Sequence, residues 1–480
     1  MSAVQNILLY KNNILHMQKK IRVFLLTMLN ISAVLSIRNW PISAEYGLQS
    51  IIFISLSLLF FFIPTALIAA ELSTGWSEKG GLFIWIKEAF GGKIGLFAVW
   101  LLWIENVIWF PTILSFIATS IAYGFFPHLI HNKWYTFDAI FFLCWIIFAM
   151  NIQGIHISGW LSSICVILGT LLPGFLIISL GIIWLLLGQP SQIVFSLENL
   201  KPTLTNLSDI SFLAGMFIGL AGIEMNAVHS KEVIQPKKTF PRAILLSTII
   251  ITILTFLGTL SIATIISKGE IFLLSGGVDV IYRCLSQFHL QAGTPIIALL
   301  IAIGSFGAAN AWSIGSCKAM LSATSEGKIF PQFLQKTNRR GAPVALLLLQ
   351  EIIVVIFSFA FIFMPTINSS YWMITILASQ IYAIMYLLLF ASAVTLRYKR
   401  NKIKRAYQIP GGHIGIWTIS LIGSSSSLFV LFSGFIPPQS LHVQSTKSFV
   451  IFLIFGLIIF CLIPFLYIQK SKPKSNSIHY

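Results

Sequence analysis

Four ionisable residues lie within long apolar runs of the sequence, and they are the first candidates for chemistry. They are Arg38, Glu105, Glu224 and Glu351. Charged side chains within the hydrocarbon of a bilayer are costly and usually functional. A buried carboxylate either takes up a proton or finds a cation. We therefore predict that Glu224 and Glu105 are gating or proton-linked residues, and we expect Glu351 at a membrane interface.

The alternative for the first three residues is structural. Arg38 could form a static ion pair with Glu224 or with Glu105 and hold two helices together, without any part in function. Unpaired, Arg38 favours an anionic ligand, whereas Glu105 favours a cationic one. The sequence does not decide between these readings.

Two of the apolar runs are interrupted by polar and helix-weakening residues. In the first run, Ser36 and Asn39 precede Pro41, and in the sixth Gly219 and Gly222 precede Glu224. Non-helical backbone at membrane depth is tolerated where it lines a cavity. Interruptions at corresponding positions in two halves of a chain indicate a transporter binding site. A proline kink and small-residue helix packing are the alternatives.

A small zwitterion suits such a pair of interruptions. Half-helix N-termini favour a carboxylate, and unwound carbonyl groups favour an ammonium group. Tyr382 and Tyr386 lie four residues apart and so share one helix face, although aromatic residues there equally suit ordinary packing. The candidate substrate-binding residues are Ser32, Val34, Leu35, Ser36, Arg38, Gly219, Leu220, Ala221, Gly222, Asn310, Trp312, Tyr382 and Tyr386.

Composition places these residues in a membrane protein. Of the 480 residues 57% are hydrophobic and only 9% are charged, against about 25% charged in soluble domains. The apolar runs approach or exceed the roughly 20 residues that cross a bilayer as a helix, so the prediction is an all-α integral membrane fold. The expected spans are 21–46, 48–70, 92–125, 136–153, 160–187, 208–229, 241–266, 293–323, 343–364, 370–396, 414–435 and 448–469.

The charge distribution predicts topology. The net charge is +17, but most of the 31 basic residues fall in alternate loops, which indicates the positive-inside rule and not nucleic-acid binding. We expect a cytoplasmic N-terminal tail (1–20), one transmembrane domain (21–469) and a short cytoplasmic C-terminal tail (470–480). A bacterial inner membrane is the expected location, with the lipid bilayer and amino acid substrates as partners.

Motifs for enzyme chemistry are missing from the sequence. There is no phosphate-binding loop and no HExxH motif, and the histidines are not at metal-ligand spacing. The five cysteines are scattered without a CxxC pair. We expect no metal, no cofactor and no enzyme activity. A channel would need a filter loop, which is also missing.

Four segments in order resemble the amino acid–polyamine–organocation superfamily. Ala69-Ala70-Glu71-Leu72-Ser73, at the end of the second span, and Gly80-Gly81-Leu82-Phe83-Ile84-Trp85, before the third, resemble one signature. The segment from Gly222-Ile223-Glu224 in the sixth span to Phe240-Pro241-Arg242 at the seventh resembles another. The others run from Asn338 to Pro343 and from Ile409 to Gly412. Within that superfamily the chain most resembles the bacterial glutamate/GABA antiporters.

This resemblance implies an inverted five-plus-five repeat with a broken first and sixth helix, plus two extra C-terminal helices. It also implies substrate between the broken helices, Glu224 in a gating or proton-linked role, and exchange of one amino acid for another. The chain departs from the pattern in two places: Val34-Leu35-Ser36 stands where many members have glycines, and the C-terminal tail is short. A proton-coupled permease for other amino acids or polyamines, or a non-transporting sensor, remains as an alternative, as a monomer or a homodimer.

Overall fold

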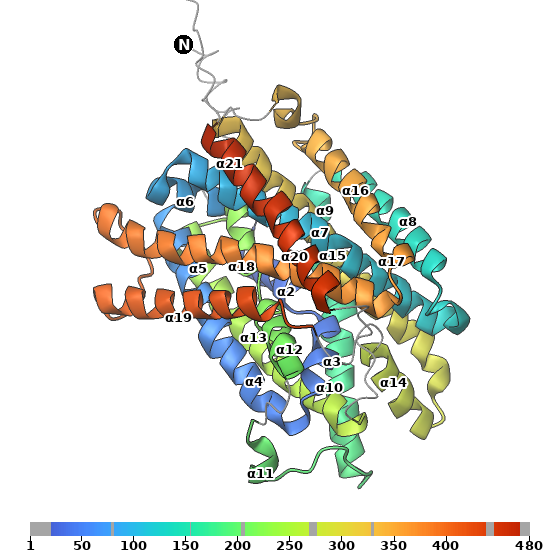
Figure 1. Ribbon diagram of the computed structural model, residues 1–480. Helices are drawn as coiled ribbons and strands as arrows, with labels where there is room; N and C mark the ends of the chain where they lie inside the picture. Colours follow the sequence, from blue (N-terminus) through green and yellow to red (C-terminus); the bar gives the residue numbers. More distant parts are fainter. Residues whose placement is uncertain are drawn as a thin grey trace, which may run out of the picture.

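The computed structural model describes residues 21–77, 81–153, 155–202, 207–267, 276–327, 331–437 and 446–470 (Figure 1). The expected tails, 1–20 and 470–480, lie outside these residues except for Lys470, which ends the last helix. Within the described ranges the secondary-structure elements are all helices, apart from one isolated β-bridge. In chain order they are α2 (Val23–Val34), α3 (Trp40–Ala44), α4 (Ser50–Ser57), α5 (Ile63–Gly75), α6 (Leu82–Phe90), α7 (Gly92–Phe125), α8 (Lys133–Asn151), α9 (Ile155–Val166), α10 (Leu172–Leu186), α11 (Leu197–Leu200), α12 (Leu207–Ile218), α13 (Pro236–Ile265), α14 (Gly276–Gln287), α15 (Thr294–Gly327), α16 (Val344–Ser358), α17 (Ala360–Phe363), α18 (Ile367–Lys399), α19 (Gly412–Ser433), α20 (Thr446–Leu457) and α21 (Ile463–Lys470).

Eleven helical spans in the described part of the chain are long and apolar enough to cross a membrane. Three of them are continued through a π-helical turn, which joins α4 to α5, α9 to α10 and α20 to α21. The remaining predicted span, the sixth, is divided between α12 and a 3-10 helix, η6 (Met225–Glu232). Twelve residues of α-helix cover only about 18 Å, less than the roughly 30 Å of hydrocarbon. A search by helix length therefore does not find this span. With it, the described chain has twelve spans, and the prediction of about twelve helices is confirmed.

The order of the spans gives two blocks of five and two additional helices. The first block runs from α2 and α3 to α10, the second from α12 and η6 to α18, and α19 and α20–α21 follow. Helices α7 and α15, third in their blocks, are both 34 residues long and pack against each other. Figure 1 shows α18 and α19 side by side, with the span of α20 and α21 crossing α18.

The central and peripheral helices differ in what they expose. Of the most apolar stretch of α7, 94% is buried, against 22% for the span that contains α20 and α21. Ile451, Phe455 and Leu466 on that outer span are exposed. Because such a surface is unfavourable in water, it fits contact with lipid. Helix α7 thus belongs to the core that positions the site.

The start of the first broken span and the end of the sixth lie at the same side of the molecule. Ile21 and Val233 form a parallel bridge, in which Ile21 N–H donates to Glu232 O at 3.1 Å and Ile234 N–H donates to Ile21 O at 2.9 Å. Glu232 Oε1 also lies 3.0 Å from Lys318 Nζ on α15. The start of the first span and the end of the sixth are therefore joined, and the two helices run in opposite directions.

A buried ion pair joins α5 to α18. Arg397 Nε donates to Glu71 Oε1 at 2.9 Å, and Arg397 Nη2 donates to Glu71 Oε2. Ile409 N–H also donates to Glu71 Oε2 at 2.9 Å, and Arg405 Nε lies 3.5 Å from Glu71 Oε1. Glu71 is 1% exposed. The loop between α18 and α19 is thus fixed against the end of α5.

Candidate substrate-binding site

The first span is interrupted between α2 and the 3-10 helix η1 (Ile37–Asn39). Leu35 (φ −77°, ψ 115°) and Ser36 (φ −133°, ψ 122°) have extended backbones. The break needs no glycine, because these dihedral angles are available to all residues. The Trp312 indole donates to Ala33 O at 3.1 Å, so a side chain of α15 satisfies a carbonyl group at the end of α2.

In the sixth span, by contrast, the break depends on glycine. Gly222 has φ +115°, and a Cβ atom there would lie 2.6 Å from the Trp312 ring. Its N–H donates to the Tyr386 hydroxyl at 3.0 Å. Only glycine combines this backbone conformation with so close an approach.

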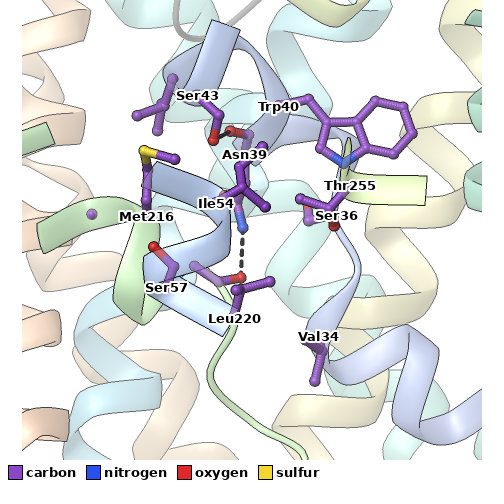
Figure 2. Close-up of a pocket in the computed structure, with 13 residues that line it drawn as sticks. Val34, Ser36, Asn39, Trp40, Ser43, Ile54, Ser57, Met216, Leu220 and Thr255 are labelled. Carbon is purple, nitrogen blue, oxygen red and sulfur yellow. Dashed lines mark hydrogen bonds between the residues drawn. The ribbon is translucent and has the colours of Figure 1, made fainter. Parts of the chain in front are cut away.

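The two interruptions contact each other directly. Asn39 Nδ2 donates to Gly219 O at 3.0 Å, as Figure 2 shows. Gly219 also leaves room for the Asn39 amide, which lies 3.1 Å from the position of a Cβ atom. The pocket in Figure 2 lies between α3, α4 and α12, with Ser36, Ser57 and Leu220 in its wall.

A cavity of about 80 Å³ lies beside these interruptions. It is larger than the 10–15 Å³ or so that one water molecule needs. Its walls come from the first, third, sixth, eighth and tenth spans. Among the lining residues are Ser32, Ser36, Arg38, Glu105, Trp109, Gly219, Ala221, Trp312, Tyr371 and Tyr382. Hydroxyl groups, charged groups, aromatic rings and unwound backbone thus line one cavity.

Glu224 lies at the end of the sixth-span break, where two tyrosines hold its carboxyl group. Tyr382 OH donates to Glu224 Oε1 at 2.6 Å, and Tyr386 OH lies 2.9 Å from Glu224 Oε2. Glu224 is 2% exposed. Because Tyr386 also accepts from the Gly222 N–H, the hydrogen bonds connect the sixth span to α18. Tyr382 lines the cavity, so a change at Glu224 reaches the cavity wall through one hydrogen bond.

Two further charged side chains face the same cavity. Arg38 Nη1 donates to Thr112 Oγ1 at 3.1 Å, and the guanidinium lies 5.1 Å from the Trp109 ring centre. Glu105 is 6% exposed, and its Oε2 atom has no hydrogen-bond partner among the described residues. No carboxylate oxygen of the described chain lies within 4.0 Å of Arg38. The static ion pair of Arg38 with Glu224 or Glu105 is therefore not formed.

The comparison with protein families agrees with this architecture. A family model described as amino acid permease matches residues 21–460. The chain belongs to the amino acid permease family. An uncharacterized transporter of Legionella pneumophila is 37% identical to the permease over 459 residues, which cover 96% of this chain and 98% of that protein.

Two other relatives have named substrates. A glutamate/gamma-aminobutyrate antiporter of Lactococcus lactis is 29% identical over 96% of the permease and 92% of its own length. A probable agmatine/putrescine antiporter of the same species is 22% identical over 73% of the permease and 74% of its own length. These relatives are transporters, so the expectation that the chain is not an enzyme is confirmed.

Most of the predicted site residues of the permease lie around the cavity. Its lining includes Ser32, Val34, Ser36, Arg38, Glu105, Gly219, Ala221, Trp312 and Tyr382. Leu220 lines the neighbouring pocket. Gly222, Glu224 and Tyr386 form the hydrogen-bonded layer next to the cavity. Leu35 is buried at the break, and Asn310 faces α9, where its Nδ2 lies 3.4 Å from Ser162 Oγ. Substrate contact by these residues stays a prediction.

Sequence reasoning missed several cavity residues, among them Asn39, Trp109 and Tyr371. A signal for Tyr371 exists: it precedes Tyr382 by eleven residues, which is three helical turns, so the two share one face of α18. Trp109 likewise follows Glu105 by four residues. Nothing in the sequence marks Asn39 as the partner of Gly219.

Glu351 is placed differently from its expected interfacial position. It is 0% exposed, and Gln350 Nε2 donates to its Oε1 at 3.4 Å. The same Gln350 nitrogen donates to Ser313 Oγ at 2.8 Å. The expectation was wrong because Glu351 lies in the middle of α16, where neighbouring helices cover it, and the apolar run alone does not reveal this.

Proposed function

We propose that the permease is a secondary active transporter that exchanges glutamate for GABA across a bacterial inner membrane by alternating access. The observation that carries this proposal is the cavity between two unwound helix segments, with charged and aromatic side chains from three further spans. A binding site near the middle of the membrane, formed by discontinuous helices, suits a transporter whose two halves move around it. The glutamate/gamma-aminobutyrate antiporter of Lactococcus lactis supports the substrate pair.

Glu224 has the gating or proton-linked role in this proposal. Its carboxyl group connects the sixth span to Tyr382 and Tyr386 on α18. An ionised carboxyl group only accepts hydrogen bonds, whereas a protonated one can also donate one. Protonation of Glu224 would therefore alter the contact between two spans that border the cavity.

The test is exchange by the purified permease in liposomes. Labelled glutamate should enter liposomes that contain glutamate or GABA, and it should not enter empty liposomes. Uptake into empty liposomes under a proton gradient would instead support a proton-coupled permease. Binding without any exchange would identify a sensor.

Glu105 favours a second candidate, an exchanger of cationic substrates, because it places a carboxyl group in the cavity wall. The probable agmatine/putrescine antiporter among the relatives supports this candidate. Liposomes loaded with agmatine or putrescine separate the two. Exchange of polyamines without exchange of glutamate would replace the first proposal.

We also propose that both termini face the cytoplasm, because the basic loops lie on their side of the membrane. Arg22 and Lys470 are exposed and offer positions for single cysteines close to these ends. In spheroplasts, which expose the outer face of the membrane, an impermeant thiol reagent should label neither until the membrane is opened. Labelling of intact spheroplasts would reverse the orientation. Crosslinking in the membrane would decide between a monomer and a homodimer.

A further inference from the structure

The guanidinium group of Arg38 lines the cavity without a carboxylate partner among the described residues. Arg38 is 5% exposed, and its Nε atom has no acceptor in the described part of the chain. Among the described residues, its one hydrogen bond is to the neutral hydroxyl group of Thr112, at 3.1 Å. The rings of Trp109 and Tyr371 lie 5.1 and 5.6 Å from its central carbon.

Arginine keeps its positive charge in proteins, so burial does not neutralise Arg38. Cation–π contacts offset part of the cost of desolvation, and one neutral hydroxyl group offsets little more. A buried charge is ordinarily paired. The other arginines that are buried in the described part of the chain follow this rule: Arg397 donates to Glu71 at 2.9 Å, and Arg405 Nε lies 3.5 Å from Glu71 Oε1. Arg38 is the exception, and it faces the cavity.

The missing counter-ion therefore has room in the cavity. A carboxylate group fits the planar guanidinium with two parallel hydrogen bonds, and Arg38 lines the cavity in which such a group would lie. Trp109 and Tyr371 confine the guanidinium from the sides of α7 and α18. Glu105 lines the same cavity but does not pair with Arg38, so it does not occupy this position.

We propose that Arg38 binds the carboxylate at the far end of the substrate, away from the α-carbon. This inference rests on the proposed exchange of glutamate and GABA and assigns the part of the substrate that one residue recognises. Glutamate has two carboxylates, and GABA retains only the one that is distal in glutamate. The group common to both substrates is thus an ammonium group separated by three carbons from a carboxylate, and Arg38 binds its anionic end.

The α-carboxylate of glutamate then has no counterpart in GABA and lies elsewhere, against the unwound backbone. Variation of Arg38 should therefore affect both substrates equally. Loss of an interaction with the α-carboxylate would affect glutamate alone. This difference separates recognition by Arg38 from a general effect on the cavity.

The experiment compares acids with their uncharged amides. Glutamate and glutamine form one pair, and GABA and 4-aminobutanamide form the other; each pair differs only at the distal group. Ligand affinity is measured by thermal stabilisation of the purified permease and by competition with exchange in liposomes. The wild-type protein should bind each acid about 10- to 100-fold more tightly than its amide, as expected for hydrogen bonds to charged groups.

Arg38→Gln should reduce affinity for both acids by the same factor and leave affinity for the amides within about twofold, which is small on the scale of such bonds. Arg38→Lys, which keeps the charge but not the planar fork, should be intermediate. Arg283→Gln is the matched control, because Arg283 pairs with Asp279 on α14, outside the cavity lining.

An unchanged preference for the acids in Arg38→Gln would overturn the inference and leave the proposed exchange intact. If that variant fails to fold, the wild-type ratio decides: equal affinity for acids and amides overturns the inference. Absence of glutamate/GABA exchange with a clear preference for the acids in binding would overturn the proposed function only. Stabilisation by none of the four compounds would overturn both.

Discussion

At the scale of single residues, the hydrogen bonds of Glu224 connect the sixth span to α18. We expect Glu224→Gln to flatten the pH dependence of exchange, because an amide cannot take up or lose the proton. Exchange rates between acidic and neutral pH, at matched protein levels in the membrane, measure this effect. Glu198→Gln is the control, since Glu198 is exposed on α11. An unaltered pH profile in Glu224→Gln would assign Glu224 a structural role.

Gly222 is a second residue whose substitution separates two physical effects. We expect Gly222→Ala to lower the melting temperature and to abolish exchange, because the new Cβ atom would lie 2.6 Å from Trp312 on a backbone with φ +115°. The backbone strain alone costs about 1–3 kcal/mol. Gly91→Ala is the control: Gly91 has φ +96° but nothing within 4 Å of its Cβ position. Equal losses of thermal stability in the two variants would mean that the contact with Trp312 is unimportant.

At the scale of helices, much of the fold can be predicted from the sequence because the bilayer requires long apolar segments. The sixth span was found from its pattern of apolar residues and glycines, although neither α12 nor η6 is long enough to cross alone. The break at Leu35 and Ser36 was inferred from polar residues and not from glycine. Such interruptions stand out in the sequence, because polar residues are rare in segments that cross the centre of the bilayer.

The cavity itself could be predicted only in part. Helical spacing shows which residues share a face, and it placed Tyr382 and Tyr386 together. It does not show which face of each helix meets which neighbour. Asn310 was therefore assigned to the site although it packs against α9, and Asn39 was missed although it donates to Gly219. Such contacts between distant segments depend on tertiary packing.

The ion pair between α5 and α18 provides a prediction at the same scale. Glu71→Gln should lower stability by about 3–5 kcal/mol, because it leaves buried guanidinium groups without a carboxylate. Glu88→Gln is the matched control: Glu88 pairs at 3.0 Å with Arg400, whose side chain is 51% exposed, and such pairs contribute about 0–1 kcal/mol. Thermal denaturation of the purified variants compares them. Similar melting temperatures would indicate that the loop after α18 is held by other contacts.

At the scale of the whole molecule, the C-terminal tail permits a deletion experiment. Removal of residues 471–480 should leave the pH dependence of exchange unchanged, because we assign the proton response to Glu224 and its hydrogen bonds with Tyr382 and Tyr386. Exchange by the truncated permease across the same pH range as the full chain is the measurement. A pH response that disappears on truncation would show that the tail takes part in regulation.

The bridge between Ile21 and Val233 has a consequence for how the permease can move. Two parallel hydrogen bonds join the beginning of the first span to the end of the sixth. While both hydrogen bonds are intact, we expect the two segments to move together at this end. A spectroscopic probe at Arg22, which is exposed, would thus also report movement of the segment at Val233, about two hundred residues further along the chain.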